Sequence, residues 1–316
     1  MNKPRLIMMV GIPGSGKSSW SKELSERYNA EIFASDKLRK ELWGDENIQG
    51  NNKELFKELH KRIICALKES KNCIYDATNI YEKNRTQFLK DISGIDCEKI
   101  CVIALTDFDI CVARNEQRDR RVPYEVIKKM YLNIDIPQYR EGWDKIIIKR
   151  TRDDLKDYDI FKFIYHLETI NHDNPHHLLT IGAHIQAVVK HIMDEYQLTF
   201  AGDIDRLERL LRAALHHDIG KEFTKSFINN KGEETEVAHY YNHEKVSAYM
   251  YIMYEKENEL ENTKRILYIA DLIGLHMRMH CICGDKEKSY QKIKNIVGKK
   301  EFEDLCILNE ADIICG

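Results

Sequence analysis

The sequence contains little of what marks fibrous, linker-rich or membrane-spanning proteins. It has only 5 proline and 15 glycine residues among 316, which excludes collagen-like and linker-dominated chains. No apolar run approaches the roughly 18 residues that a membrane span needs. The first five residues lead into only five apolar residues, Leu6 to Val10, which is too short for a signal peptide. We therefore expect a cytoplasmic protein with no membrane partner.

Cysteine pairs and an excess of one charge are also missing. The nine cysteines include no Cys-x-x-Cys pair, which argues against a disulfide framework and against a structural zinc knuckle. Forty-nine basic and 52 acidic residues give a net charge of −3, so the overall charge does not indicate bulk nucleic-acid binding. A local basic groove is still compatible with this balance, because the field depends on where the charges lie.

Histidine divides the chain into two parts. Twelve of the 13 histidines lie from His166 onward, so we expect the two parts to do different chemistry. The length also suits two domains of roughly 100–200 residues each, and a charged stretch at 151–157 separates them. We predict a first domain at 1–150, a linker at 151–171 and a second domain at 172–316.

Hydrophobic patterning predicts a different fold for each part. The first part alternates short β-branched or aliphatic runs with amphipathic stretches, which predicts an α/β fold with a parallel sheet and helices on both faces. The expected strands are Leu6 to Val10, Glu31 to Ala34, Cys73 to Tyr75, Ile100 to Leu105 and Ile146 to Ile148. The second part has no comparable strand series, and its long helical stretches predict an all-α domain. They include Ile185 to Glu195, Asp205 to Leu215, His243 to Glu255 and Thr263 to His280.

A phosphate-binding loop follows the first expected strand. Residues 11–18 read GIPGSGKS, which satisfies the P-loop pattern between a hydrophobic strand and a helix. In such a loop the backbone amides and the lysine bind phosphates, and the hydroxyl ligates Mg²⁺. We therefore expect ATP or GTP with Mg²⁺. The expected nucleotide-binding residues are Gly11, Gly14, Ser15, Gly16, Lys17 and Ser18, with Ser18 also on the metal ion.

Acidic residues follow the second and third expected strands. Asp36 would lie at the sheet edge where open α/β folds bind ligands, and it could be the base for an acceptor hydroxyl. It could equally be the N-cap of the next helix. Arg39, one helical turn further on, could hold an acceptor phosphate. Asp76 would lie beside the P-loop as an outer magnesium ligand, with Thr78 and Asn79 near the acceptor.

An arginine run follows the fourth expected strand. Arg114, Arg118 and Arg121 are spaced four and three residues apart, so on a helix they would share one face, flanked by Arg120. Such a run is usually a solvated charged face. We favour a lid over the nucleotide, because a kinase must neutralise the charge spread over the transferring phosphoryl group.

These segments together resemble the phage-type polynucleotide kinase family over roughly residues 5–150. The resemblance rests on residues 11–18, 35–39 and 76–79, and on residues 114–118 leading to Val122-Pro123 and Met130-Tyr131. It implies that Lys17 and Ser18 bind ATP and magnesium and that Asp36 activates a 5′-hydroxyl. It further implies that Arg39 binds the acceptor's phosphate and that Arg118 holds the donor phosphates. The lid segment is about one residue shorter than in the family, which leaves open whether Arg118 acts alone or with Arg121.

The second part carries histidines and aspartates that could meet around a cation. His217 and Asp218 follow an expected helix, His184 begins another, and Asp312 lies near the end of the sequence. Nitrogen and oxygen donors of this kind suit Mn²⁺, Ni²⁺, Fe²⁺ or Mg²⁺ better than an ion that prefers thiolates. Any one of these histidines could instead be structural.

Two further histidines extend this set. His243 and His276 could hold a second metal ion or bind phosphate oxygens. Two ions would clamp a phosphoryl group and generate hydroxide from bound water. His280 and His239 have weaker claims.

In its order along the chain, this set resembles the HD-domain phosphohydrolase family over roughly residues 172–316. Residues 174–177 (NPHH) and 241–246 (YNHEKV) are similar to the branch attached to transfer-RNA nucleotidyltransferases and end-repair proteins. The resemblance implies that His184, His217, Asp218 and Asp312 ligate metal. It implies hydrolysis of phosphomonoesters or phosphodiesters, including 2′,3′-cyclic ends, with Asp218 at the catalytic centre. His176 and His177 fit a simple turn after Pro175 as well.

Together the two parts predict a bifunctional enzyme that heals RNA or DNA ends. It would combine a 5′-hydroxyl polynucleotide kinase with a 2′,3′-cyclic phosphodiesterase and 3′-phosphatase. No ligase active-site lysine motif is evident, so sealing would require a separate RNA ligase. Two alternatives stay open: a small-molecule or mononucleotide kinase fused to an HD nucleotidase, and a kinase with a non-catalytic HD module that senses nucleotides. The sequence does not indicate the oligomeric state.

Overall fold

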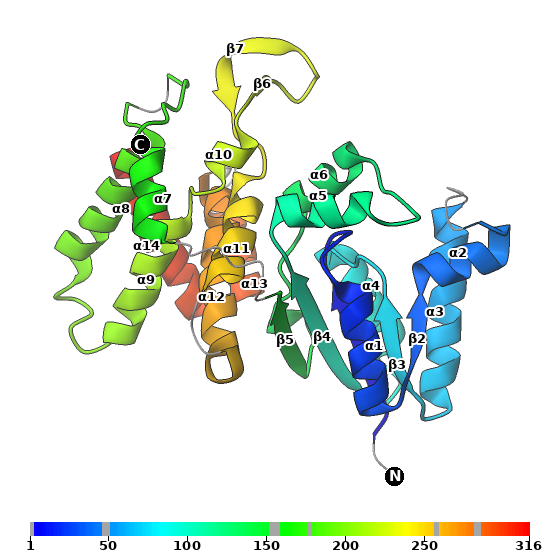
Figure 1. The fold of residues 1–316 in the computed structure, drawn as a ribbon. Helices are drawn as coiled ribbons and strands as arrows, with labels where there is room; N and C mark the ends of the chain where they lie inside the picture. Colours follow the sequence, from blue (N-terminus) through cyan, green and yellow to red (C-terminus); the bar gives the residue numbers. More distant parts are fainter. Residues whose placement is uncertain (1–2, 46–50, 152–158, 176–177, 256–258, 281–285) are drawn as a thin grey trace. The chain divides into compact units, whose positions relative to one another are not determined.

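The structure, a computed structural model, describes residues 3–45, 51–151, 159–175, 178–255, 259–280 and 286–316. The chain divides into two compact units, Met1–Leu155 and Lys156–Gly316, and each is described by itself (Figure 1). Residues 152–158 of the predicted linker lie outside the described residues, as do His176 and His177. No helix within the described ranges is both long and apolar enough to span a membrane.

The N-terminal unit is built on a five-stranded parallel sheet, which confirms the predicted α/β fold. The strand order is β2-β3-β1-β4-β5, and each neighbouring pair is parallel. The strands are β1 (Arg5–Val10), β2 (Ala30–Ala34), β3 (Asn72–Asp76), β4 (Glu98–Leu105) and β5 (Lys145–Arg150). The helices are α1 (Lys17–Tyr28), α2 (Ser35–Trp43), α3 (Asn52–Lys68), α4 (Glu82–Asp91), α5 (Phe108–Glu116), α6 (Tyr124–Leu132) and the short 3-10 helix η1 (Tyr139–Glu141).

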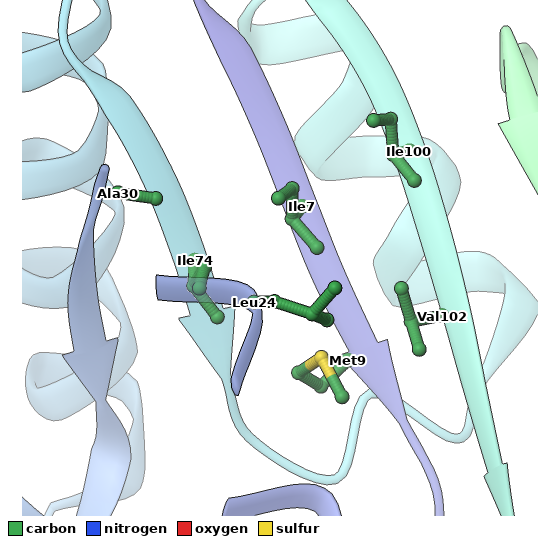
Figure 2. Close-up of a cluster of buried hydrophobic side chains, with 7 residues drawn as sticks. All are labelled: Ile7, Met9, Leu24, Ala30, Ile74, Ile100 and Val102. Carbon is green, nitrogen blue, oxygen red and sulfur yellow. The ribbon is translucent and has the colours of Figure 1, made fainter. Parts of the chain in front are cut away.

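Helices cover both faces of this sheet. On one face, Leu24 of α1 packs against Ile7 and Met9 of β1 and against residues of β3 and β4 (Figure 2). On the other face, the ring of Tyr75 lies 5.5 Å from His60 of α3 and 5.4 Å from Phe88 of α4. Burial on both faces is why the strands are almost continuously apolar. Because the strands are parallel, the loops that follow β1, β2, β3 and β4 open at one edge of the sheet.

The C-terminal unit is mainly helical, as predicted. Ile164 and Leu167 pack in its core against Ile181, Ile185 and Ile219. Helices α8, α9, α11, α12 and α14 pack against one another. The helices are α7 (Ile160–Leu167), α8 (Ile181–Tyr196), α9 (Ile204–His216), α10 (Lys221–Thr224), α11 (His243–Tyr254), α12 (Glu259–His280), α13 (Lys286–Val297) and α14 (Lys299–Cys315).

Two features of this unit correct the sequence-based expectations. It is not entirely α-helical, because β6 (Ser226–Ile228) and β7 (Glu234–His239) form an antiparallel hairpin. The Asn229 side chain closes the turn by accepting hydrogen bonds from the backbone N–H groups of Lys231 and Glu233. The predicted linker at 151–171 is wrong over α7, an amphipathic helix whose Ile164 and Leu167 are buried in the core while Phe161 and Tyr165 are exposed.

Candidate functional site

The glycine-rich loop has the backbone geometry of a phosphate cradle. Gly14 and Gly16 have φ angles of 83° and 84°, in the left-handed region that glycine tolerates. A side chain at Gly14 would also collide with the backbone of Cys111 on α5. The loop ends at the N-terminus of α1, where free backbone amides and the helix dipole favour an anion.

Lys17 begins α1 and brings a buried positive charge to this loop. Its side chain donates a hydrogen bond from Nζ to the carbonyl oxygen of Ile12 (2.8 Å), and the residue is 9% exposed. Burial lowers the pKa of Lys17 to about 8, although Asp76 at the end of β3 acts in the opposite direction. A phosphate would stabilise the charged ammonium that burial disfavours. The adjacent Ser18 is exposed, and its hydroxyl with the Asp76 carboxylate suits Mg²⁺, which prefers oxygen ligands.

Asp36 lies at the same edge of the sheet, in the first turn of α2. The N-cap of this helix is Ala34, so the N-cap interpretation of Asp36 is wrong. Its carboxylate forms ion pairs with three arginines, Arg39 at 3.1 Å, Arg118 at 3.6 Å and Arg120. The structure thus brings the expected base together with the expected phosphate-binding arginines.

The arginine run forms a loop rather than a helical face. α5 ends at Glu116, so the expected shared face of Arg114, Arg118 and Arg121 does not form. The Asn115 side chain is 3% exposed; it accepts a hydrogen bond from the N–H of Val122 (3.0 Å) and donates one to its carbonyl oxygen (2.8 Å). This pair of bonds closes residues 117–122 into a loop, which we call the lid loop.

The lid loop places the expected Arg118 beside Asp36, together with Arg120 rather than Arg121. Arg118 and Arg120 contact Asp36, whereas Arg121 is exposed. Sequence reasoning treated Arg120 as a flanking residue because it assumed that the helix continued. The signal that could have corrected this is Asn115, an amide able to pair with the backbone past the end of a helix.

Thr78 and Asn79 have a structural role in this unit. The Asn79 side chain donates a hydrogen bond to the carbonyl oxygen of Met9 (2.9 Å), and the N–H of Gly11 donates one to the backbone carbonyl oxygen of Thr78 (3.0 Å). These bonds hold the loop after β3 against the start of the P-loop. Both residues therefore shape the base of the phosphate cradle, and their placement near the acceptor stays a prediction.

Four histidines of the C-terminal unit are oriented in the same way. Each places Nδ1 beside a backbone carbonyl oxygen, so that Nδ1–H donates and the lone pair stays on Nε2. The pairs are His184 with Cys315 (3.1 Å), His217 with Ala214 (2.7 Å), His243 with Tyr240 (2.8 Å) and His276 with Ile273 (2.7 Å). This is how proteins present imidazole to a metal ion.

The first cluster joins α8, the end of α9 and α14. The Nε2 atoms of His184 and His217 lie 3.3 Å apart, and Oδ1 of Asp312 lies 2.9 Å from the former and 3.7 Å from the latter. One ligand atom from each of these buried residues lies within 4.8 Å of the others. Two Nε2 atoms that face each other beside a carboxylate need a positive charge between them, either a metal cation or a proton on one ring. Burial lowers the pKa of His217, but Asp218 and Asp312 outweigh it and raise that pKa to about 10.

The second cluster joins α11 and α12 to the same centre. The Nε2 atoms of His243 and His276 lie 3.3 Å apart, and Asp218 connects them to the first cluster. Oδ1 of Asp218 lies 3.1 Å from His243 and 3.8 Å from His276, while Oδ2 lies 3.4 Å from both His184 and His217. One carboxylate therefore bridges the two clusters.

The electrostatics of this centre favour bound cations. Burial alone would raise the pKa of Asp218, but His217 and Lys221 hold it well below its usual range. Burial lowers the pKa of His276 to about 3, which keeps its ring neutral at physiological pH. Ionised carboxylate and neutral imidazole are the forms that bind metal. The donor set of nitrogen and oxygen atoms without a thiolate fits Mn²⁺, Fe²⁺, Ni²⁺ or Mg²⁺.

A buried lysine beside Asp218 was not singled out from the sequence. Lys221 is 5% exposed, and its Nζ lies 2.7 Å from Oδ2 of Asp218 and 3.2 Å from Nε2 of His172. Nδ1 of His172 lies 2.7 Å from the carbonyl oxygen of Leu179, so Nε2 can accept from the lysine. The signal was available in residues 217–221 (HDIGK), where Lys221 falls one turn beyond Asp218.

The histidines with weaker claims lie outside the two clusters. The Nε2 atom of His280 lies 2.7 Å from Oδ2 of Asp312, a contact that helps to hold this carboxylate in position. His239 stacks on Tyr241 and contacts the hydroxyl of Thr235 (3.1 Å). Neither is in the two groups of potential ligands found among the described residues.

Comparison with known proteins agrees with this division into two sites. Residues 6–137 match the family model of the AAA domain, and residues 179–313 match that of the HD domain. A curated relative, L-seryl-tRNA(Sec) kinase of Methanococcus maripaludis, is 29% identical over 149 residues, which are 44% of this chain and 56% of the relative. The chain thus spans about half the length of the curated relative it matches.

Solved structures with partial similarity to this chain were also found. A chain of the Pnkp1/Rnl/Hen1 RNA repair complex is 22% identical, with a TM-score of 0.35, over 41% of this chain and 43% of that one. A putative kinase from Chloroflexus aurantiacus is 16% identical, with a TM-score of 0.39, over 52% and 98%. A fungal RNA kinase is 15% identical, with a TM-score of 0.38, over 49% and 41%.

The two family matches coincide with the two sites. The AAA-domain match contains the P-loop, Asp36 and the lid loop, and the HD-domain match contains both histidine–aspartate clusters. The chain is therefore a fusion of a P-loop domain of the AAA type with an HD domain.

Proposed function

We propose that this protein heals nucleic-acid ends by combining a 5′-hydroxyl polynucleotide kinase with a metal-dependent hydrolase of 2′,3′-cyclic and 3′-phosphates. The observation that carries the proposal is that one chain holds two separate sites suited to phosphorus chemistry. One is the glycine loop with buried Lys17 beside Asp36, and the other is the pair of clusters bridged by Asp218. Together they would convert the ends left by many ribonucleases into ends that a ligase can join.

In the kinase site each residue has a distinct task. The loop amides and Lys17 hold the donor phosphates of ATP, and Ser18 supplies a hydroxyl for Mg²⁺. Asp36 accepts the proton of the acceptor hydroxyl as it attacks the γ-phosphoryl group. Arg39, buried at 8% exposure and held by Asn52 on α3 (3.2 Å), is placed to bind a phosphate of the acceptor strand. A neighbouring phosphate is what separates a polynucleotide acceptor from a simple alcohol.

In the hydrolase site the clusters would hold the metal ions, and Lys221 supplies a fixed positive charge. Bound divalent ions would polarise a phosphoryl group and lower the pKa of a bound water. Lys221, kept in place by Asp218 and His172, is positioned to pair with a phosphoryl oxygen. Asp218 would help to hold both ions, because Oδ1 lies beside His243 and Oδ2 lies beside His184.

One RNA substrate tests both activities. A short RNA with a 5′-hydroxyl and a 2′,3′-cyclic phosphate is incubated with ATP, Mg²⁺ and Mn²⁺, and both ends of the product are analysed. Lys17→Ala should abolish 5′ phosphorylation and leave 3′ healing unchanged, whereas Asp218→Ala should do the reverse. Loss of both activities in either folded variant would contradict the two-site proposal.

A second candidate acceptor is favoured by the curated relative. L-seryl-tRNA(Sec) kinase acts, by its name, on a seryl group attached to tRNA. The net charge of −3 does not itself indicate a groove that binds a polynucleotide. The same kinase assay with seryl-tRNA and with a mononucleoside separates the candidates. If either is phosphorylated far faster than the 5′-hydroxyl RNA, the proposed acceptor is wrong.

A further inference from the structure

Both oxygens of the Asp36 carboxylate are engaged in ion pairs. Oδ1 lies 3.1 Å from Nη1 of Arg39 and also contacts Arg120, and Oδ2 lies 3.6 Å from Nη2 of Arg118. A general base needs a lone pair directed at the hydroxyl that it deprotonates. A carboxylate surrounded by three guanidinium groups is a poor base until at least one of them leaves.

The three arginines are not equally free to leave. Arg39 shares the helix of Asp36, is 8% exposed, and has a second partner in Asn52. Arg118 and Arg120 belong to the lid loop, which is tied down at its ends by the bonds between Asn115 and Val122. We therefore expect the two lid arginines to move while Arg39 stays.

The phosphate cradle offers the lid arginines a stronger partner. Burial is the main cause of the lowered pKa of Lys17, but Arg118 lowers it further and Asp36 raises it, so all three charges belong to one site. A bound triphosphate carries several negative charges and accepts bidentate hydrogen bonds from guanidinium groups. It would compete with a single carboxylate for the same two arginines.

We propose that Arg118 and Arg120 move from Asp36 to the donor phosphates when a nucleoside triphosphate binds, so that nucleotide binding itself exposes the base. This inference rests on the proposed kinase function and deepens it by naming a control of that site. Arg120, which no sequence motif singled out, becomes a nucleotide-binding residue in place of the exposed Arg121. The donor must then bind before the acceptor, because the Asp36 carboxylate stays paired with all three guanidinium groups until the exchange.

The test measures nucleotide affinity rather than activity. The dissociation constant of the non-hydrolysable analogue β,γ-imido-ATP with Mg²⁺ is measured for the full-length wild type, Asp36→Asn, and a variant with Arg118→Ala and Arg120→Ala. The triple variant that combines these changes completes the cycle. Asp109→Asn is the matched control, since it removes one exposed carboxylate from α5 of the same unit. Asp36→Ala replaces Asp36→Asn if circular dichroism shows that the latter is misfolded.

The exchange predicts that Asp36→Asn binds the analogue more tightly than the wild type. In this variant the nucleotide no longer competes with the carboxylate for the two lid arginines. A competition worth about 1 kcal/mol corresponds to a gain of about fivefold in affinity. The gain should vanish in the background that lacks both arginines, and Asp109→Asn should stay within about twofold of the wild type. An unchanged or weaker affinity in Asp36→Asn, or a gain that survives without the arginines, would overturn the exchange.

These affinities do not depend on the acceptor. If they follow the predicted pattern while no 5′-hydroxyl end is phosphorylated, the exchange stands and the proposed acceptor is wrong. If 5′-hydroxyl ends are phosphorylated without the pattern, only the exchange is wrong.

Discussion

Asp218→Asn should destabilise the metal-free C-terminal unit by about 3 kcal/mol. Asp218 is 1% exposed, and its Oδ2 lies 2.7 Å from Nζ of Lys221, which is 5% exposed. Asparagine keeps the shape but leaves a buried ammonium without its carboxylate. Removing one partner of a buried ion pair costs about 3–5 kcal/mol, and for a unit of this size about 3 kcal/mol lowers Tm by about 10 °C.

Calorimetry of the full chain in EDTA measures this effect, with the unfolding of the N-terminal unit as an internal reference. Adding Lys221→Met to Asp218→Asn should restore much of the loss, because both buried charges are then gone. Asp205→Asn on α9 is the control: this carboxylate is 58% exposed in its pairs with Arg209 and Arg265 and should matter by less than about 1 kcal/mol. A wild-type Tm for Asp218→Asn, or no recovery in the double variant, would refute the reasoning.

Three further predictions concern the N-terminal unit. Because burial lowers the pKa of Lys17 to about 8 and phosphates raise it, nucleotide binding near pH 8.5 should take up a proton; titration calorimetry in two buffers of different ionisation heat should show this for the wild type and not for Lys17→Met. Burial also lowers the pKa of His60 below its usual value. As the pH falls through about 6.5, this histidine is therefore protonated in the unfolded chain before it is protonated in the folded one. The free energy of unfolding should decrease as the pH falls below that value. Urea unfolding between about pH 5.5 and 7.5 should show this decrease, and the free energy of unfolding should change less with pH in His60→Phe. Arg85 and Glu141 form an ion pair with both side chains at 0% exposure; Arg85→Met should lower the stability of this unit by about 3 kcal/mol, and adding Glu141→Gln should recover much of it, whereas equal unfolding midpoints for all three proteins would contradict this.

Features governed by local sequence were predictable. The five strands and the P-loop were placed correctly because apolar runs and glycine spacing act over a few residues. The metal-ligand set came from a family resemblance, since no periodicity indicates that His184 and Asp312, 128 positions apart along the sequence, meet at 2.9 Å. Only the packing of α8 against α14 brings them together.

The errors arose where a side chain overrides a local pattern. The spacing of Arg114, Arg118 and Arg121 predicted one helical face, but Asn115 pairs with Val122 and ends the helix early. Arg120 then reaches Asp36 and Arg121 does not. Contacts of this kind depend on tertiary placement.

The central claim is that one chain holds a nucleotide-phosphate site and a separate two-metal site. Anomalous scattering from crystals grown with Mn²⁺ and β,γ-imido-ATP tests it most directly. The account predicts an anomalous peak beside Ser18 at the bound nucleotide and two peaks in the C-terminal unit that share Asp218. Those two peaks should be coordinated by His184, His217 and Asp312 and by His243 and His276, respectively. Crystals with an occupied P-loop and no manganese between these histidines would contradict it.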